Sequence, residues 1–187
     1  MTFDTLKVRH DIAAPPMNLL GPELVRDMVS LIQRAEADEA VKVVVFKSAD
    51  PDCFISHVDV TRIKEYRQEA AKLTGEASLG LLVRHLSTSR LVTIAQIEGR
   101  VRGAGSEFVV ACDMRFAARE SAIFGQPESG LGQTPGAGGI QHLARLDAAG
   151  VSSGAGAWQV PPFVLIEPVP KEARTKGAKR GTHPGHR

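Results

Sequence analysis

Hydrophobic positions in the first 147 residues follow two patterns, one typical of buried strands and the other of amphipathic helices. The runs 41–46 (VKVVVF) and 91–97 (LVTIAQI) are short, rich in β-branched residues and bounded by charged or turn residues. Such runs indicate strands buried within a sheet. Three weaker strand candidates are 6–10, 114–117 and 122–124.

Apolar residues spaced by three and four positions predict the helices. The segment 22–37 begins with Pro22, which is favoured at the first position of a helix because an N–H group has no partner there. Its apolar residues recur at helical spacing: Leu24, Met28, Leu31, Ile32 and Ala35. Further helices are predicted over 61–73, 76–86, 107–112 and 140–146. Strands and helices that alternate with short links predict an α/β fold.

Two of the predicted strands run into loops that contain small residues. A loop that begins at 50–52 (DPD) and reaches Asp59 follows the strand 41–46, and the glycine-rich stretch 99–105 follows the strand 91–97. Each loop precedes a predicted helix, whose N-terminus has unpaired backbone N–H groups and a partial positive charge. N–H groups from both loops that point at one oxygen atom would form an oxyanion hole.

Composition and charge exclude several classes of protein. Lys and Arg exceed Asp and Glu by only two (23 against 21), which does not indicate a strongly basic nucleic-acid-binding protein. Two cysteines, Cys53 and Cys112, are too few for a disulfide framework or a multi-cysteine zinc site. The apolar stretches are too short to span a membrane, and the N-terminal residues have no signal-peptide pattern. We therefore expect a cytoplasmic protein.

The last 40 residues differ in composition from the rest. Residues 148–187 contain six Gly, five Pro, six Lys or Arg and two Glu, a net charge of +4, whereas residues 1–147 have a net charge of −2. We expect a core over 1–146 and a poorly ordered basic tail over 147–187. The alternative is a basic arm for nucleic acid or an acidic partner. A solvated tail is favoured because no aromatic stacking residue accompanies the basic run.

Common nucleotide, metal and nucleophile motifs are missing from the sequence. Phe108 stands where a dinucleotide-binding pattern starting at Gly103 requires its third glycine. No Gly-Lys-Ser/Thr follows a glycine run, and Ser106 does not lie in a Gly-x-Ser-x-Gly motif. The six histidines are scattered and form no His-Glu-x-x-His motif, so we expect no metal site.

Two glutamates stand out by their sequence neighbours. Glu107 precedes the apolar stretch 108–112, and Glu128 lies between 125–127 (GQP) and 130–132 (GLG). A carboxylate among apolar residues can have a raised pKa, and two carboxylates at one water molecule can divide the roles of general base and general acid. From the residues alone two alternatives stay open: a helix N-terminal residue favoured by the dipole for Glu107, and a surface loop residue for Glu128.

Three separated stretches resemble motifs of one enzyme family. The first comprises 92–99 (VTIAQIEG), 103–107 (GAGSE) and 111–115 (ACDMR). The second comprises 124–128 (FGQPE) and 131–139 (LGQTPGAGG), and the third is the stretch 41–59. In their order along the chain and in their spacing, they resemble the enoyl-CoA hydratase/isomerase (crotonase) superfamily over roughly residues 14–146. The resemblance implies a ββα spiral core that lacks most of the family's C-terminal helical region, as in a truncated chain.

The resemblance also implies the site residues. The catalytic carboxylates would be Glu107 and Glu128, and the oxyanion-hole N–H groups would be those of Val58 and Ala104. Substrate contacts are implied for His57, Asp59, Gly103, Gly105, Pro135 and Gly136. The implied reaction adds water at C3 of a 2-enoyl-CoA whose thioester carbonyl is bound by the two amides. Coenzyme A is part of the substrate, so no separate cofactor or metal is implied.

The chain departs from the family's pattern at four points. His57-Val58 stands where Gly-Ala is usual, so this loop is bulkier, and His57 has the alternative of a side chain facing solvent. Ala104 replaces a customary glycine, and only one strand fits before residue 14. The family forms homotrimers or hexamers with the help of C-terminal helices, which residues 147–187 do not resemble.

The presence of both carboxylates favours hydration of the double bond. Two alternatives stay open: isomerisation or another reaction of a CoA thioester, and a truncated, inactive protein with the crotonase fold. The expected partner is an acyl-CoA substrate, with neither nucleic acid nor a membrane involved.

Overall fold

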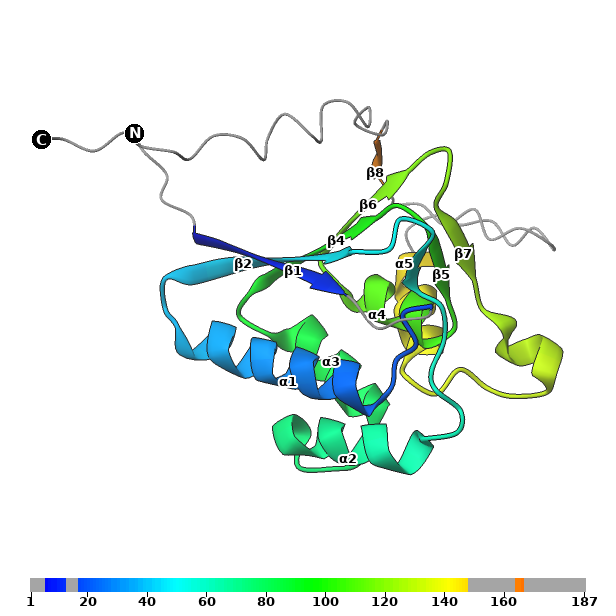
Figure 1. Ribbon diagram of the computed structural model, residues 1–187, viewed down its shortest axis with the longest axis horizontal. Coiled ribbons are helices and arrows are strands. Elements are labelled where there is room, and N and C mark those ends of the chain that lie inside the picture. The colour runs from blue at the N-terminus through cyan, green and yellow to red at the C-terminus, as the bar shows by residue number, and fades with distance from the viewer. Residues whose placement is uncertain (1–5, 13–16, 148–163, 167–187) are drawn as a thin grey trace, which may run out of the picture.

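The computed structural model describes residues 6–12, 17–147 and 164–166. They form two parallel sheets with helices packed against them (Figure 1). The larger sheet has the order β1 (Leu6–Ile12), β2 (Val41–Ser48), β4 (Val92–Ile97), β6 (Met114–Ala118) and β8 (Val164–Ile166). The smaller sheet has the order β3 (Cys53–Ile55), β5 (Arg100–Arg102) and β7 (Ile123–Gly125). The α/β class predicted from the sequence is confirmed.

The helices follow the strands in a repeated unit. The helices are α1 (Pro22–Ala37), α2 (Ile63–Thr74), α3 (Leu79–Thr88), α4 (Ala104–Ala111), the 3-10 helix η1 (Pro127–Leu131) and α5 (Gly139–Asp147). A strand of the larger sheet, a strand of the smaller sheet and a helical segment succeed one another three times: β2-β3-α2, β4-β5-α4 and β6-β7-η1. This repeat agrees with the ββα spiral that the family resemblance implies.

The helix α4 is the most buried of these helices. All eight of its residues are buried, as expected for a helix that is apolar on every side. The Phe108 ring contacts Phe46 of β2 edge-on, with 5.0 Å between centroids, and lies 6.5 Å from the ring of Phe54 on β3. Contacts with both sheets therefore fix the position of α4, and with it that of Glu107.

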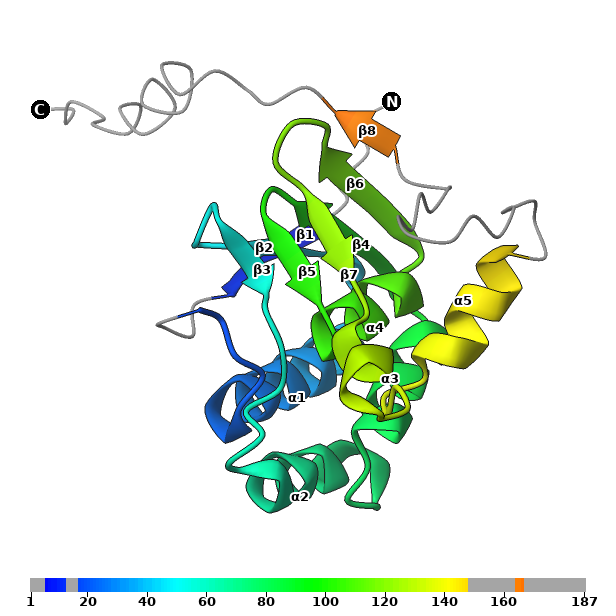
Figure 2. The same ribbon diagram turned by 90° about the vertical axis from the view of Figure 1, so that its right-hand side faces the viewer.

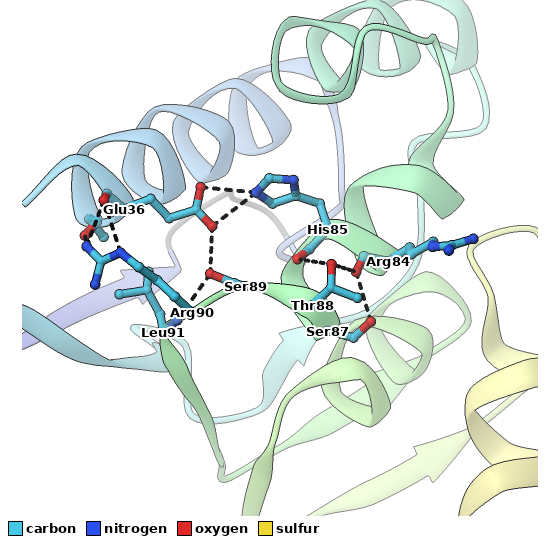
Figure 3. Close-up of polar contacts among 9 residues, drawn as sticks. Glu36, Arg84, His85, Ser87, Thr88, Ser89, Arg90 and Leu91 are labelled. Atoms are coloured by element: carbon cyan, nitrogen blue, oxygen red, sulfur yellow. Dashed lines mark hydrogen bonds and ion pairs between the residues drawn. The ribbon is translucent and has the colours of Figure 1, made fainter.

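Polar contacts join the C-terminal end of α1 to the start of β4 (Figure 3). The Glu36 carboxylate accepts a hydrogen bond from the Ser89 hydroxyl at 2.6 Å and lies 3.0 Å from Nε2 of His85 on α3. The Arg90 guanidinium donates to the backbone carbonyls of Ala35, Glu36, Asp38 and Val41. Carbonyl groups at a helix C-terminus have no partner inside the helix, so Arg90 satisfies several of them from outside.

Several predicted boundaries were wrong. β3 and β5 lie in stretches that the sequence indicated as loops, and each is only three residues long. α4 begins at Ala104, three residues before the predicted start. α3 begins at Leu79 instead of residue 76, because the Ser78 hydroxyl accepts the Leu81 N–H and caps the helix there.

One strand comes from the segment predicted as a tail. Val164–Ile166 forms β8, which pairs in parallel with β6. The other residues of 148–187 lie outside the described residues, so the predicted boundary between core and tail stays a prediction. Among the described helices, none is both long and apolar enough to cross a membrane.

Candidate active site

The three parallel strands of the smaller sheet have their carboxyl ends on the same side, here called the edge of the smaller sheet (Figure 2). Predicted site residues follow each strand. Cys53 of β3 pairs with Arg100 of β5, which pairs with Ile123 of β7. The chain then continues from β3 to residues 57–59, from β5 to residues 103–105, and from β7 to Glu128. Ligands commonly bind beyond the carboxyl ends of parallel strands, so this edge is the natural place for a site.

Gly103 and Gly105 allow the segments at this edge to approach closely. A Cβ atom added at Gly105 would lie 2.3 Å from the carbonyl oxygen of Ile55. A Cβ atom at Gly103 would lie 2.7 Å from Cδ2 of His57 and 2.8 Å from Oε1 of Glu128. Gly103 also has a φ of +51°, a conformation that favours glycine. The position next to Gly103 is therefore the place where His57 and Glu128 meet.

Glu107 is buried and anchored by main-chain groups. Its Oε1 atom accepts hydrogen bonds from the N–H groups of Ala137 and Gly139, both at 2.8 Å, and the residue is 2% exposed. Burial raises the pKa of Glu107, and the negative charge of Glu128 raises it further. The two N–H groups and the charge of His57 act in the opposite direction, but the net shift is upward and favours the protonated form.

We expect the substitution Glu107→Gln to change how stability depends on pH. The pKa of Glu107 in the folded chain lies above its ordinary value of 4.5, so the unfolded chain loses this proton at lower pH. As the pH rises from 4.5 through the raised pKa, the free energy of unfolding of the wild type should fall relative to that of the variant. Below pH 4.5 the free energies of unfolding of the wild type and the variant should differ by a constant amount. Urea denaturation of both proteins over a pH series measures this, and a constant difference throughout would contradict it.

Glu128 is buried and lies beside His57. The residue is 6% exposed, and its Oε1 atom lies 3.8 Å from Nε2 of His57. Its Oε2 atom is also buried and has no hydrogen-bond partner within the described part of the chain. The alternative of a surface residue for Glu128 is therefore wrong, whereas the His57 side chain is partly exposed and only its Nε2 atom is buried. The two glutamates are near enough for the charge of Glu128 to raise the pKa of Glu107.

The N–H groups of Val58 and Ala104 take no part in the hydrogen bonds of the described residues. The bridge between Leu20 and Val58 uses the Leu20 N–H, bound to the His57 carbonyl, and the Asp59 N–H, bound to the Leu20 carbonyl. The Val58 N–H donates to neither of these carbonyl groups. The Ala104 N–H lies in the first turn of α4, where N–H groups have no partner within the helix. That both groups point at one substrate oxygen stays a prediction.

Comparison with known proteins identifies the family. Residues 10–160 match the family model described as enoyl-CoA hydratase/isomerase. The chain belongs to the enoyl-CoA hydratase/isomerase family. It is 35% identical to the short-chain-enoyl-CoA hydratase of Clostridium acetobutylicum over 137 residues, which are 73% of this chain and 51% of that protein. It is 32% identical to the crotonyl-CoA hydratase of Syntrophomonas wolfei, over 73% of this chain and 52% of that protein.

Solved structures of enoyl-CoA hydratases share the fold. A candidate enoyl-CoA hydratase from Streptomyces avermitilis is 56% identical, with a TM-score of 0.71 over 78% of this chain and 52% of that one. The enoyl-CoA hydratase of Bacillus anthracis is 26% identical, with a TM-score of 0.65 over 79% of this chain and 56% of that one. The predicted crotonase fold is confirmed. The chain spans about half the length of the curated relatives it matches.

Three further residues that the family resemblance assigns to substrate contact lie in different settings. Asp59 accepts hydrogen bonds from the hydroxyl of Thr61 at 2.6 Å and from its N–H at 3.0 Å, and the hydroxyl bond lowers the pKa of Asp59. Asp59 thus shapes the turn that leads into α2. Pro135 and Gly136 directly precede Ala137, whose N–H binds Glu107. A contact of these three residues with substrate stays a prediction.

Sequence reasoning missed three groups at this site. The N–H groups of Ala137 and Gly139 anchor Glu107, although the sequence indicated only a glycine-rich turn there. The side-chain amide of Gln126 is buried, and neither of its polar atoms has a partner among the residues that the structure describes. Its place two residues before Glu128 in the FGQPE motif was the available signal.

Metal and thiol chemistry have little support in the described residues. No group of three or more His, Cys, Asp or Glu in this part of the chain could hold a metal ion. Both cysteines are buried and free, and burial raises the pKa of Cys112 to about 12. At neutral pH its thiol is therefore protonated and a poor nucleophile.

Proposed function

We propose that the chain catalyses the addition of water to the double bond of a 2-enoyl-CoA, giving a 3-hydroxyacyl-CoA. One observation supports this most strongly: Glu107 and Glu128 are both buried, and Oε1 of Glu128 lies against Gly103, the residue that precedes the helix carrying Glu107. A pair of carboxyl groups in one site fits general acid–base chemistry on a water molecule. The relatives named as enoyl-CoA hydratases support the same class of reaction.

In the proposed mechanism the Val58 and Ala104 N–H groups bind the thioester oxygen of the substrate. Negative charge develops on this oxygen as water attacks C3, and each N–H donor would stabilise that transition state by about 3 kcal/mol. Glu107 and Glu128 hold the water between them. One carboxylate takes a proton from the water as its oxygen bonds to C3, and the C2–C3 π electrons move toward the thioester oxygen. As these electrons return, a protonated carboxyl group of the pair delivers a proton to C2. The two bonds formed, C3–OH and C2–H, account for the whole water molecule.

The acyl-CoA thioester supplies the carbonyl that accepts the electrons, so the proposal includes no metal ion or redox cofactor. We also propose a location in the cytoplasm, from the apolar pattern of the sequence, and assembly into homotrimers or hexamers, from the family resemblance alone.

Crotonyl-CoA is the substrate that tests the proposal. We expect loss of the enoyl absorbance on addition of the folded chain, with 3-hydroxybutyryl-CoA as the product identified by mass spectrometry. A product of unchanged mass would show isomerisation, and release of free CoA would show thioester hydrolysis. If circular dichroism shows a folded chain but crotonyl-CoA stays unchanged, the proposed hydration is rejected and the inactive alternative is favoured.

A further inference from the structure

His57 is the ionisable residue at this site that the proposed mechanism leaves without a role. Its side chain is 27% exposed, yet its Nε2 atom is buried and has no hydrogen-bond partner among the described residues. This Nε2 atom lies 3.8 Å from Oε1 of Glu128, within the distance of an ion pair. A buried nitrogen without a partner costs free energy, so its placement beside a carboxyl group needs an explanation.

The surrounding backbone keeps the imidazole in this place. Nδ1 of His57 lies 3.4 Å from the Val58 carbonyl, within the loop that carries a proposed oxyanion N–H group. The ring fills the space above Gly103, where any side chain would clash with both the ring and Glu128.

We infer that His57 is a positioning residue that holds the Glu128 carboxyl group through Oε1 and so leaves Oε2 to face the water or the substrate. This inference rests on the proposed hydration, because it assigns separate tasks to the two oxygen atoms of one of its carboxyl groups. It agrees with the geometry, in which Oε1 faces His57 whereas the buried Oε2 has no partner in the described chain.

The separation of 3.8 Å is longer than a direct hydrogen bond. Hydrogen bonds in catalytic sites are often long before the substrate binds and shorten in the complex. A water molecule that contacts both Nε2 and Oε1 would serve the same purpose. In either case a polar atom at the position of Nε2 is what restrains Glu128: depending on the tautomer, it donates to the carboxylate or accepts from the protonated carboxyl group. A side chain of equal bulk without a polar atom would not restrain it.

Two variants of similar size separate this role from simple packing. His57→Gln keeps an amide that can donate or accept a hydrogen bond near the Nε2 position, whereas His57→Leu fills the space without a polar atom. For crotonyl-CoA hydration we expect His57→Leu to lower kcat about tenfold with KM changed less than about threefold, and His57→Gln to keep kcat within about threefold of the wild type. An undiminished kcat in His57→Leu, or an equal loss in both variants, would overturn the inference.

The matched control removes a histidine that lies outside the site. His85 is on α3 and contacts Glu36 (Figure 3), so His85→Gln should leave kcat unchanged. A loss of kcat in this variant equal to that of His57→Leu would show a general effect of histidine replacement and would count against the inference.

A second measurement does not depend on activity. At a fixed pH, the ¹⁵N resonance of His57 Nε2, assigned by its absence from His57→Gln, should shift in Glu128→Gln. It should not shift in Glu120→Gln, because Glu120 is exposed on a turn. An unchanged resonance in Glu128→Gln would overturn the contact, whether or not the chain hydrates crotonyl-CoA. A shifted resonance in a chain without hydration would support the contact while rejecting the proposed function, so the two failures are distinguishable.

Discussion

Replacement of Glu128 by Gln is expected to lower kcat for crotonyl-CoA hydration by about 1000-fold, the scale of a lost general acid or base. The amide has nearly the shape of the carboxyl group but neither accepts nor releases the proton. Because Glu128 is buried in a space that already fits its side chain, the variant should fold normally. Steady-state kinetics over a range of crotonyl-CoA concentrations measures the effect.

Binding and a surface variant provide the controls for this substitution. Butyryl-CoA has the same thioester without the double bond, and its affinity by calorimetry should change little in Glu128→Gln. The exposed Glu120→Gln variant should keep the wild-type kcat. If Glu128→Gln hydrated crotonyl-CoA at the wild-type rate, Glu128 would not be a catalytic residue.

The substitution Gly105→Ala is expected to lower the free energy of unfolding by about 3 kcal/mol, at the upper end of typical overpacking costs. The new methyl group would lie 2.3 Å from the Ile55 carbonyl oxygen and 2.8 Å from the Ile55 Cβ atom. Main-chain atoms of β3 cannot move aside without disturbing its pairing with β5. Urea denaturation followed by circular dichroism gives the difference in free energy.

The matched control for Gly105→Ala is Gly130→Ala, in the helix η1. An added Cβ atom at Gly130 would meet nothing within 4 Å, so its free energy of unfolding should stay within about 0.5 kcal/mol of the wild type. Equal stability of the two variants would mean that α4 and β3 do not approach as closely as described.

The longer helices and most strands of the larger sheet were predictable because their signals are local. The predicted helix 22–37 has the observed bounds of α1, where a proline marks the start and apolar residues define the buried face. The predicted strand 41–46 lies within β2. In both cases the information is contained in one short window of sequence.

The smaller sheet could not be predicted in the same way. β3 and β5 have three residues each, too few for a periodic pattern, and they follow stretches rich in turn residues. Their strand conformation depends on pairing with each other and with β7, which are far apart in the sequence. Long-range pairing of this kind is a property of the folded chain and leaves little local signal.

The sequence indicated the two glutamates but not the contacts that they make. The apolar neighbours of Glu107 indicated an unusual carboxyl group, and the structure places it in a buried position. The partners of Glu107 are main-chain N–H groups, which nearly every residue type has, so no sequence motif specifies them. The orientation of His57 toward Glu128 follows from the adjacency of β3, β5 and β7, which the sequence did not reveal.

The short strand β8 has a consequence for how the molecule meets other molecules. Without it, β6 would be the outermost strand, and the main chain of its five residues would be unpaired on the side away from β4 and available to another polypeptide. With β8 in place, three of these five residues are paired, and the outermost strand on this side of the sheet has only three residues. Short outer strands are one of the ways in which proteins resist sheet-to-sheet aggregation, so Val164–Ile166 reduces the main chain available for such pairing on this side.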